Sequence, residues 1–254
     1  MLISSQTYQY ILYGWIGLGL VSFPYLLTKK QPYGRHTSNS WGPMISNQLG
    51  WLIMEGVAPI LISLWFWTGN LPKTSASYFF YGIYMLHYIY RGYIFPFRTR
   101  TQGKKMPLLI STSAVFFNLC NTFILGYYLG NLGGNYADTY FTSPQFIIGL
   151  VIFVSGAFIN IKSDNILINL RKPGETGYKI PQGFLFSYIS CPNLFGEIVE
   201  WIGFGILVGT LPGFSFPLWT MVNLIPRALD HHKWYKEKFP DYPQQRKALI
   251  PGLL

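Results

Sequence analysis

The chain has 254 residues, of which 50% are hydrophobic, 19% are aromatic and only 11% are charged. A water-soluble domain carries about 25% charged residues, so this composition excludes an ordinary soluble enzyme and favours a membrane protein. The formal net charge of +10 does not require a nucleic acid partner, because a single basic face turned toward the cytosol accounts for it.

Seven apolar stretches recur along the chain, and each is long enough to cross a bilayer at ~20 residues per crossing. They lie at about residues 8–27, 44–67, 76–96, 107–130, 144–161, 183–211 and 213–229. The first has no basic segment before it and no small-residue cleavage site, so we interpret it as a retained helix and not as a signal peptide. The sequence predicts an all-α integral membrane protein with seven transmembrane helices.

The basic residues predict the orientation, because Lys and Arg collect on the cytoplasmic side of membrane proteins. Of the 19 basic residues, 18 fall in or beside the first, third and fifth gaps between stretches or in the C-terminal tail. Only Lys73 falls on the other side. We therefore expect the N-terminus outside or in a lumen and the C-terminus in the cytosol, in either a bacterial inner membrane or the endoplasmic reticulum.

The chain shows no internal repeat, low-complexity tract or linker, so we expect one membrane domain over residues 1–254, acting as a monomer. Both cysteines, Cys120 and Cys191, lie in apolar stretches. This placement excludes a disulfide framework and a thiolate-rich metal site, and it predicts small buried side chains with no metal.

Carboxyl and amide groups interrupt two of the apolar stretches. Glu55 lies near the middle of the second, and Asn193, Glu197 and Glu200 lie in the sixth, where spacings of four and three residues put them on one helical face. Ionisable groups at membrane depth are costly and mostly face a polar cavity, so they predict a site inside the membrane. The alternative for Asn193 and Glu197 is a role in polar packing between helices.

More polar residues follow the cytosolic end of the fifth stretch. Asn160 and Asp164 lie four residues apart and can exchange hydrogen bonds with a ribose or an adenine edge. Arg171 comes two turns later, before a proline- and glycine-containing loop that ends in Tyr178.

Three residues after the seventh stretch share one helical stripe, since Arg227, His231 and Tyr235 recur at intervals of four. This stripe suits a phosphate and a stacked ring. A rim of side chains that binds lipid headgroups is the alternative interpretation.

Two long segments of the C-terminal half read NIKSDNILINLRKPGETGYKIPQGFLFSYISCPNLFGEIVEWIGF and RALDHHKWYKEKFPDYPQQRKALIP. They resemble the steroid 5α-reductase family almost without a break from about residue 160 to residue 251. The N-terminal half resembles it more sparsely, through YGRHT after the first stretch, Glu55 in the second, and His87-Tyr88 with Arg91 in the third. That family consists of seven-helix membrane enzymes that use NADPH to reduce the Δ4 double bond of 3-oxo steroids.

The resemblance implies a steroid pocket formed by helices of about residues 1–130 and an NADPH site formed by about residues 144–254, facing the cytosol. Carried over position by position, it implies cofactor contacts at Arg35, Asn160, Asp164, Arg171, Tyr178, Asn193, Glu197, Arg227, His231, Tyr235 and Arg246. No G-x-G-x-x-G follows a strand, so the cofactor is held without a Rossmann domain.

One segment departs from the family pattern, because RTRTQGKK stands after the third stretch where an Asn-Arg-Gly-Arg-like turn is expected. The resemblance therefore does not assign which of four basic residues contacts a phosphate. These are Arg98, Arg100, Lys104 and Lys105.

Hydride addition to the β-carbon of an enone requires a group that stabilises negative charge on the carbonyl oxygen. Glu55 and Tyr88 lie near the middle of their stretches, at similar expected depth, and the resemblance assigns them this task. We expect Tyr88 to donate to the C3 carbonyl while Glu55 polarises it or donates in protonated form. The lipophilic enone, such as testosterone or progesterone, would enter from the membrane lipid.

Three other classes of protein remain open from the sequence. A related reductase of polyprenols, enoyl-CoA thioesters or sterol double bonds would keep the cofactor half and change the N-terminal half. An isoprenylcysteine-type methyltransferase would bind S-adenosylmethionine, which has no phosphates for these arginines. A lipid transporter or receptor would explain the polar residues without any cofactor.

Overall fold

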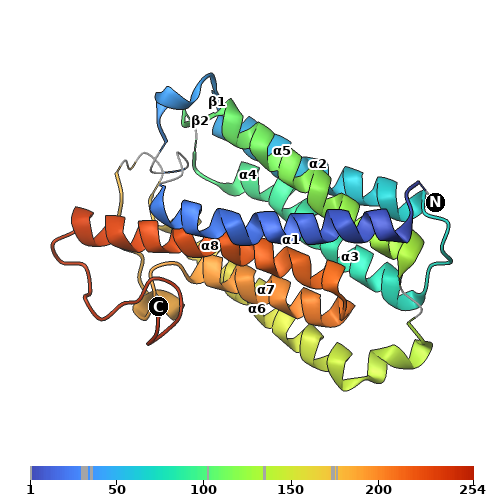
Figure 1. Ribbon diagram of the computed structural model, residues 1–254. Helices are drawn as coiled ribbons and strands as arrows, with labels where there is room; N and C mark the ends of the chain where they lie inside the picture. The colour runs from blue at the N-terminus through green and yellow to red at the C-terminus, as the bar shows by residue number, and fades with distance from the viewer. Residues whose placement is uncertain are drawn as a thin grey trace. The chain divides into compact units, whose positions relative to one another are not determined.

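Figure 1 shows the computed structural model, which describes residues 2–29, 34, 37–101, 103–133, 136–172, 175 and 177–254. The described chain is mainly helical, with one two-stranded sheet. It divides into two compact units. Unit 1 comprises Met1–Gly17, Gln31–Phe146 and Leu211–Gly213, and unit 2 comprises Leu18–Lys30, Ile147–Thr210 and Phe214–Leu254.

The long helices are α1 (Ser5–Thr28), α2 (Asn47–Trp67), α3 (Ser75–Ile89), α5 (Leu108–Thr122), α6 (Pro144–Asn169), α7 (Pro192–Val208) and α8 (Leu211–Lys238). Two π-helices, η3 (Tyr90–Ile94) and η4 (Phe123–Leu132), extend α3 and α5 without a break, and α4 (Phe95–Arg98) follows η3. The short elements are η2 (Asn39–Trp41), β1 (Met44–Ser46), β2 (Lys105–Pro107), η5 (Asp138–Thr142) and η6 (Phe184–Ser187).

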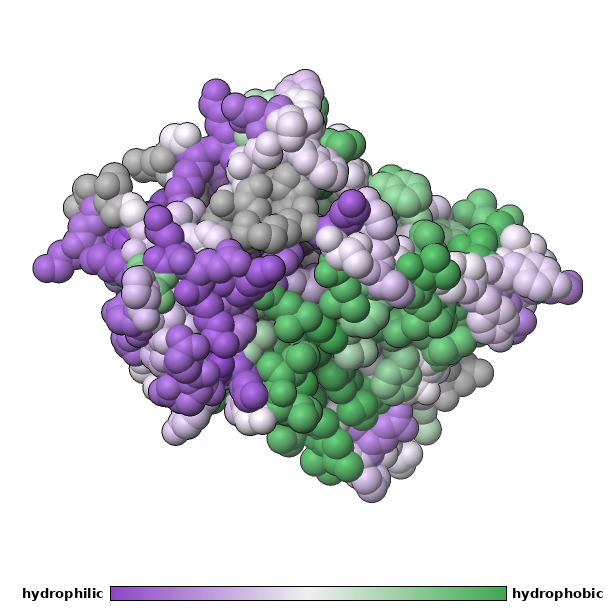
Figure 2. All heavy atoms as spheres, turned by 60° about the vertical axis from the view of Figure 1, so that its left-hand side comes forward, coloured by the Kyte–Doolittle hydropathy of each residue, from purple (hydrophilic) through white to green (hydrophobic). Residues whose placement is uncertain are grey.

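Among the residues that the structure describes, four helical segments are long and apolar enough to cross a membrane: α1, α2, α5 with η4, and α6. The prediction of a helical protein with membrane-length apolar helices is thereby confirmed, whereas the count of seven crossings and the orientation stay predictions. Large hydrophobic side chains such as Val21, Ile60 and Val151 are exposed, and Figure 2 shows hydrophobic residues gathered on the surface. Lipid-facing helices produce such a surface.

The sixth predicted helix begins nine residues later than expected, at Pro192 instead of residue 183. Gly183 and Phe184 both have positive φ angles, 78° and 48°, which an α-helix does not tolerate. Pro192 lacks an N–H and suits the first turn of a helix. The apolar residues before it form η6 and a bridge from Ile189 to Lys247 in the C-terminal tail.

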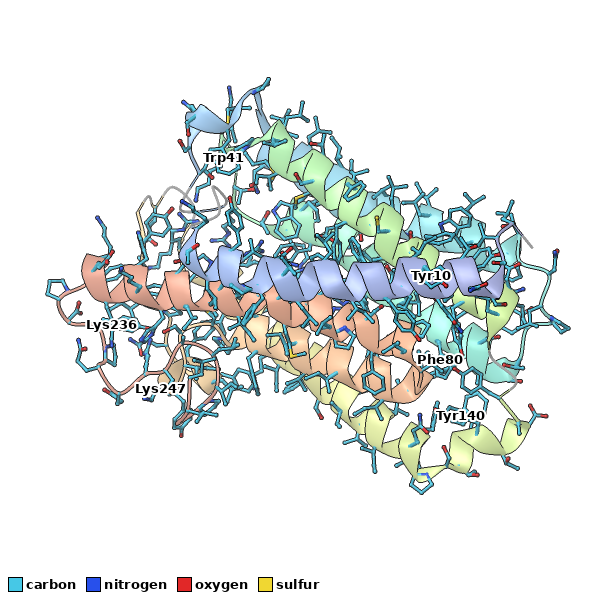
Figure 3. The ribbon with its side chains drawn as sticks, viewed as in Figure 1. Tyr10, Trp41, Phe80, Tyr140, Lys236 and Lys247 are labelled. Atoms are coloured by element: carbon cyan, nitrogen blue, oxygen red, sulfur yellow. The ribbon has the colours of Figure 1, made fainter. Side chains whose placement is uncertain are left out.

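Unit 1 is organised around α2, which packs against α3, η3, α5 and η4. The antiparallel strands β1 and β2 join the starts of α2 and α5, with Ile45 opposite Met106. Ser46 caps α2 by accepting a hydrogen bond from the Leu49 N–H, and so fixes where the helix begins. An aromatic cluster that includes Phe80 and Tyr140, labelled in Figure 3, closes the other end of this unit.

Lys73, the basic residue expected on the non-cytosolic side, has a structural role in unit 1. Its ammonium donates to the main-chain carbonyls of Gly69 (3.0 Å), Leu71 (2.6 Å) and Gly130 (3.3 Å). An ammonium has three donors, so these contacts satisfy all of them. Lys73 thus ties the loop after α2 to the end of η4, which accounts for a basic residue at this position.

Unit 2 depends on glycines that let α6 and α7 approach closely. A Cβ at Gly156 would overlap the backbone of Glu200, and a Cβ at Gly196 would overlap the backbone of Asn160. A Cβ at Gly203, about two turns after Gly196 on α7, would likewise overlap the backbone of Phe153. Small residues at helix interfaces are the usual means of close packing in membranes.

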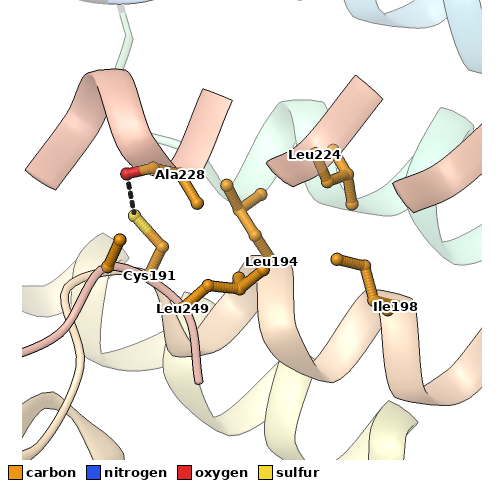
Figure 4. Close-up of a cluster of buried hydrophobic side chains, with 7 residues drawn as sticks. Cys191, Leu194, Ile198, Leu224, Ala228 and Leu249 are labelled. Carbon is orange, nitrogen blue, oxygen red and sulfur yellow. Dashed lines mark hydrogen bonds between the residues drawn. The ribbon is translucent and has the colours of Figure 1, made fainter. Parts of the chain in front are cut away.

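A hydrophobic cluster joins α7, α8 and the C-terminal tail of unit 2 (Figure 4). The Cys191 thiol lies 3.9 Å from the Ala228 carbonyl, and Leu194 and Leu224 fill the space beside them. Leu249 brings in the tail, so residues after α8 are part of the core and not a loose extension. Cys120 and Cys191 are both free thiols.

Candidate functional site

In unit 1 the structure places Tyr88 in a buried polar cluster. The Tyr88 ring stacks on Tyr84 with centroids 4.6 Å apart, and its hydroxyl donates to Asn118 Oδ1 at 3.4 Å. Asn118 in turn donates through Nδ2 to the Met54 carbonyl at 2.7 Å. Glu55, the next residue, is half-buried and lies within electrostatic reach of Tyr84. The two residues predicted for catalysis therefore lie around one cluster, and their catalytic role stays a prediction.

The turn of α2 that carries Glu55 is held by η3. Tyr93 donates from its hydroxyl to the Gly56 carbonyl at 2.6 Å. A Cβ at Gly92 would come within 2.8 Å of the Gly56 nitrogen, so only glycine allows this approach. π-Helical turns are rare and occur frequently at functional sites, which agrees with their position here.

In unit 2 four predicted cofactor residues meet where α6 and α7 are closest. Asn160 donates through Nδ2 to the Asn193 carbonyl (2.9 Å) and to Glu197 Oε2 (3.4 Å), and Asn193 donates through its own Nδ2 to Asp164 Oδ1 (3.1 Å). Each helix contributes a pair four residues apart, so the pairs face one another. The result is a group of two amides and two carboxyls. On the same helix as Asn160 and Asp164, the buried Ser163 hydroxyl has no hydrogen-bond partner within the described ranges.

The loop after α6 carries Arg171 and Tyr178. Arg171 donates to the Gly177 carbonyl at 3.2 Å, and the Tyr178 ring meets Trp234 of α8 edge-on at 4.8 Å. Glu175 accepts from Lys179 (2.6 Å) and from the Lys172 N–H (2.7 Å), and these hydrogen bonds hold the pKa of its carboxyl below the usual range. The loop is thus fastened to α8 near the predicted phosphate-binding residues. Pro173 and Gly174, expected to shape this loop, lie outside the described residues.

The predicted stripe on α8 has two different environments. Arg227 and His231 are partly exposed, whereas Tyr235 is only 4% exposed. The Tyr235 ring stacks on Tyr242 of the tail, with centroids 5.3 Å apart and planes at 12°. The ring face expected to stack on a ligand therefore packs against the protein itself, and a cofactor contact by Tyr235 would involve its hydroxyl.

Arg246 is buried and holds the loop between α6 and α7 against the tail. It donates to the Pro181 carbonyl (3.0 Å) and to Gln182 Oε1 (2.8 Å), and its guanidinium lies 5.3 Å from the Tyr242 ring. These contacts give Arg246 a structural role, and its predicted cofactor contact is not tested by them. Arg35, the other arginine implied by the resemblance, lies outside the described residues.

The unassigned basic segment after α4 belongs to unit 1. Arg98 donates to the Tyr90 hydroxyl at 2.6 Å, which fastens it to the π-helix. Which of the four basic residues there contacts a phosphate stays open.

The sequence analysis did not single out two polar networks that the structure reveals. In unit 2 the Ser190 hydroxyl lies 2.6 Å from both His232 Nδ1 and the Tyr242 hydroxyl. In unit 1 Asn118 links Tyr88 to α2. The sequence does offer one indication for Asn118, because an amide inside an apolar stretch usually hydrogen-bonds to a group on another helix. Nothing in local spacing indicates the partners of Ser190.

The chain is similar to several known proteins. Residues 104–254 match the family model for 3-oxo-5-alpha-steroid 4-dehydrogenase. The chain is 37% identical over 253 residues to steroid 5-alpha-reductase DET2 of Gossypium hirsutum, with 98% of both chains covered. It is 40% identical over 223 residues to 3-oxo-5-alpha-steroid 4-dehydrogenase 1 of Homo sapiens, covering 87% of this chain and 85% of the human protein.

The corresponding Mus musculus protein is 40% identical over 249 residues, with 93% of both chains covered. The matched lengths include residues of both units. The chain belongs to the 3-oxo-5-alpha-steroid 4-dehydrogenase family and is an oxidoreductase.

Proposed function

We propose that this protein uses NADPH to reduce the Δ4 double bond of 3-oxo steroids such as testosterone or progesterone. The observation that carries the proposal is the buried cluster around Tyr88 and Glu55 in a chain whose relatives are steroid 5-alpha-reductases. A phenol and a carboxyl are the groups that an enone carbonyl needs, since negative charge develops on its oxygen during reduction.

The residues of unit 2 fit a nicotinamide dinucleotide. The amides of Asn160 and Asn193 and the carboxyls of Asp164 and Glu197 match the hydrogen-bonding groups of a carboxamide and of ribose hydroxyls, and the Ser163 hydroxyl of α6, unpartnered within the described ranges, leaves a polar group to satisfy.

Arginines at positions 171 and 227 would hold the phosphates by charge-assisted hydrogen bonds, and the extra 2′-phosphate of NADPH gives the second arginine a partner. When bound, the cofactor supplies the hydride that adds to the β-carbon of the enone.

Two residues of unit 1, Tyr88 and Glu55, would act on the carbonyl of the enone. Tyr88 donates a hydrogen bond to the C3 carbonyl oxygen, and Glu55 polarises the same carbonyl or donates in its protonated form. The Tyr88 hydroxyl and the main chain on both sides of Glu55 are held by hydrogen bonds before substrate arrives, so little reorganisation accompanies the development of charge. The α-carbon then takes a proton from solvent or from a nearby acid.

We further propose that the protein crosses the membrane seven times as a monomer, with the cofactor residues on the cytosolic side. The concentration of Lys and Arg in the cytosolic gaps supports this orientation. Helical runs too short or too polar to qualify alone, α3 with η3 and α4, α7, and the start of α8, would supply the remaining crossings. The membrane is that of the endoplasmic reticulum or of a bacterial cell.

The test is a turnover assay with purified protein in detergent, with NADPH consumption followed for testosterone, progesterone, a polyprenal and an enoyl-CoA. Reduction of the steroids alone supports the proposal. Reduction of only the polyprenal or the enoyl-CoA would show that the substrate belongs to that class and is not a steroid. Tyr88→Phe and Glu55→Gln should each lower kcat by about 10²–10³, the usual effect of removing one oxyanion donor.

NADPH affinity distinguishes the two groups of residues. It should stay within about twofold of wild type in Tyr88→Phe, whereas Arg227→Ala should weaken it by about 1.5–3 kcal/mol, the typical contribution of a hydrogen bond to a charged group. If NADPH affinity were unchanged in both Arg227→Ala and Arg171→Ala, the basic residues would instead be assigned to binding lipid headgroups.

A further inference from the structure

We propose that Asn118 is a positioning residue for the reduction, acting through Tyr88. This inference rests on the proposed function. Asn118 lies on α5, is 3% exposed, and is hydrogen-bonded both to the Tyr88 hydroxyl and to the Met54 carbonyl. It therefore connects the α3 residue that would bind the substrate carbonyl with the residue that precedes Glu55 on α2.

The chemistry of the three groups fixes which way the Asn118 amide faces. A main-chain carbonyl can only accept, so the Nδ2 group must face Met54, and the short distance of 2.7 Å indicates a strong bond. The Oδ1 atom then faces Tyr88 and can only accept. The Tyr88 hydroxyl is therefore the donor in its hydrogen bond to Asn118.

The two hydrogen bonds differ in strength, and the difference suits a positioning role. The distance from Tyr88 to Asn118 is 3.4 Å, beyond the usual range for a strong bond, whereas Asn118 is anchored at 2.7 Å. The Tyr88 hydroxyl can therefore redirect its hydrogen bond from Asn118 to a substrate carbonyl while the amide stays in place. Because Oδ1 has no hydrogen to offer, it would not stabilise a phenolate, and Tyr88 acts as a hydrogen-bond donor that keeps its proton.

The backbone on both sides of Glu55 is held by side chains from other segments. Asn118 of α5 binds the Met54 carbonyl, and Tyr93 of η3 binds the Gly56 carbonyl at 2.6 Å. Asn118 is the member of this pair that also reaches Tyr88. It thereby sets the Tyr88 hydroxyl relative to the turn that carries Glu55, and both groups are required at one carbonyl.

The main experiment is a double-mutant cycle between Asn118→Leu and Tyr88→Phe. Leucine has a similar shape without hydrogen bonds, so kcat should fall about 10- to 100-fold, as small misplacements of reacting groups do. KM and NADPH affinity should stay within about twofold. The double variant should be no slower than Tyr88→Phe alone, because Asn118 acts only through Tyr88. A general structural defect would instead add to the loss from Tyr88→Phe.

A second variant, Asn118→Asp, gives a readout that packing alone would not change. A protonated carboxyl can donate to the Met54 carbonyl and accept from Tyr88, as the amide does, whereas a carboxylate can only accept. The kcat of this variant relative to wild type at the same pH should therefore be highest at low pH and fall as the carboxyl ionises. A ratio near one at every pH would overturn the role of the donor to Met54.

Ser111→Ala is the matched control. Ser111 is buried two turns earlier on α5, and its hydroxyl contacts the Met106 sulfur at 3.3 Å. The control should keep wild-type kcat. If wild type reduces steroids and Asn118→Leu does so at the same kcat, or if the cycle is additive, the inference fails alone. If wild type reduces none of the enones, the proposed function fails and the inference falls with it.

Discussion

Replacing Gly196 with alanine should separate α6 from α7 at the level of the predicted cofactor residues. A Cβ at this position would overlap the Asn160 nitrogen and would lie 2.8 Å from the Gly156 carbonyl oxygen and 2.9 Å from the Asn160 Cα. The nearest atoms are all backbone, so no flexible side chain can move aside. Relief requires the helices to move apart by about 1 Å, to reach ordinary van der Waals distance.

A shift of that size would break the hydrogen bonds between the helices. The bond from Asn160 to the Asn193 carbonyl is 2.9 Å and the bond from Asn193 to Asp164 is 3.1 Å, so both would exceed the range in which such bonds form. Interhelical hydrogen bonds in membranes contribute about 0.6–1.7 kcal/mol each. Overpacking adds about 1–3 kcal/mol. We expect a total destabilisation of about 2–6 kcal/mol.

Two measurements check this expectation in detergent-purified protein, namely the apparent melting temperature and the affinity for NADPH. Both should fall in Gly196→Ala, the affinity by about tenfold or more, since 1.4 kcal/mol corresponds to a factor of ten. The control is Gly17→Ala in α1, where no heavy atom lies within 4 Å of the added carbon. Because alanine has the higher helix propensity, this control should be neutral or stabilised by up to about 1 kcal/mol.

The reasoning would be refuted if Gly196→Ala melted at the wild-type temperature and bound NADPH with wild-type affinity. That result would mean that the close approach of α6 and α7 is not required for the polar group between them.

Three further outcomes are expected. Lys73→Met should lower stability by about 1–3 kcal/mol in thermal unfolding, because three carbonyls each lose a hydrogen bond from the ammonium. Burial and the charges of Lys236 and Lys247, labelled in Figure 3, hold the pKa of His232 below its ordinary 6.5. The unfolded state therefore binds more protons than the folded state, so the stability that neutral His232 contributes above about pH 6.5 is lost as the pH falls. Protease cleavage of the C-terminal tail should increase as the pH is lowered in wild type, and should increase less in His232→Asn. In sealed cells an impermeant thiol reagent should label Asp138→Cys and spare Glu175→Cys, and equal labelling would contradict the orientation.

Features that depend on short spacing along the chain could be predicted from the residues alone. A backbone in lipid must satisfy its own hydrogen bonds, so long apolar stretches predict helices, and the structure has them. Residues four apart lie on one helical face, so Asn160 with Asp164, and Asn193 with Glu197, were predicted to act together, and the structure brings all four into one group.

The helix faces that meet, and the polar groups that the protein satisfies internally, become visible only in the folded chain. The meeting of α6 and α7 depends on glycines about 40 residues apart, whose effect comes from absent side chains that carry no local signal. Tyr235 lies on the predicted stripe, yet its ring packs against Tyr242 of the tail. The link from Asn118 to Tyr88 and Met54 spans three separate helices, and helical periodicity relates residues within one helix only.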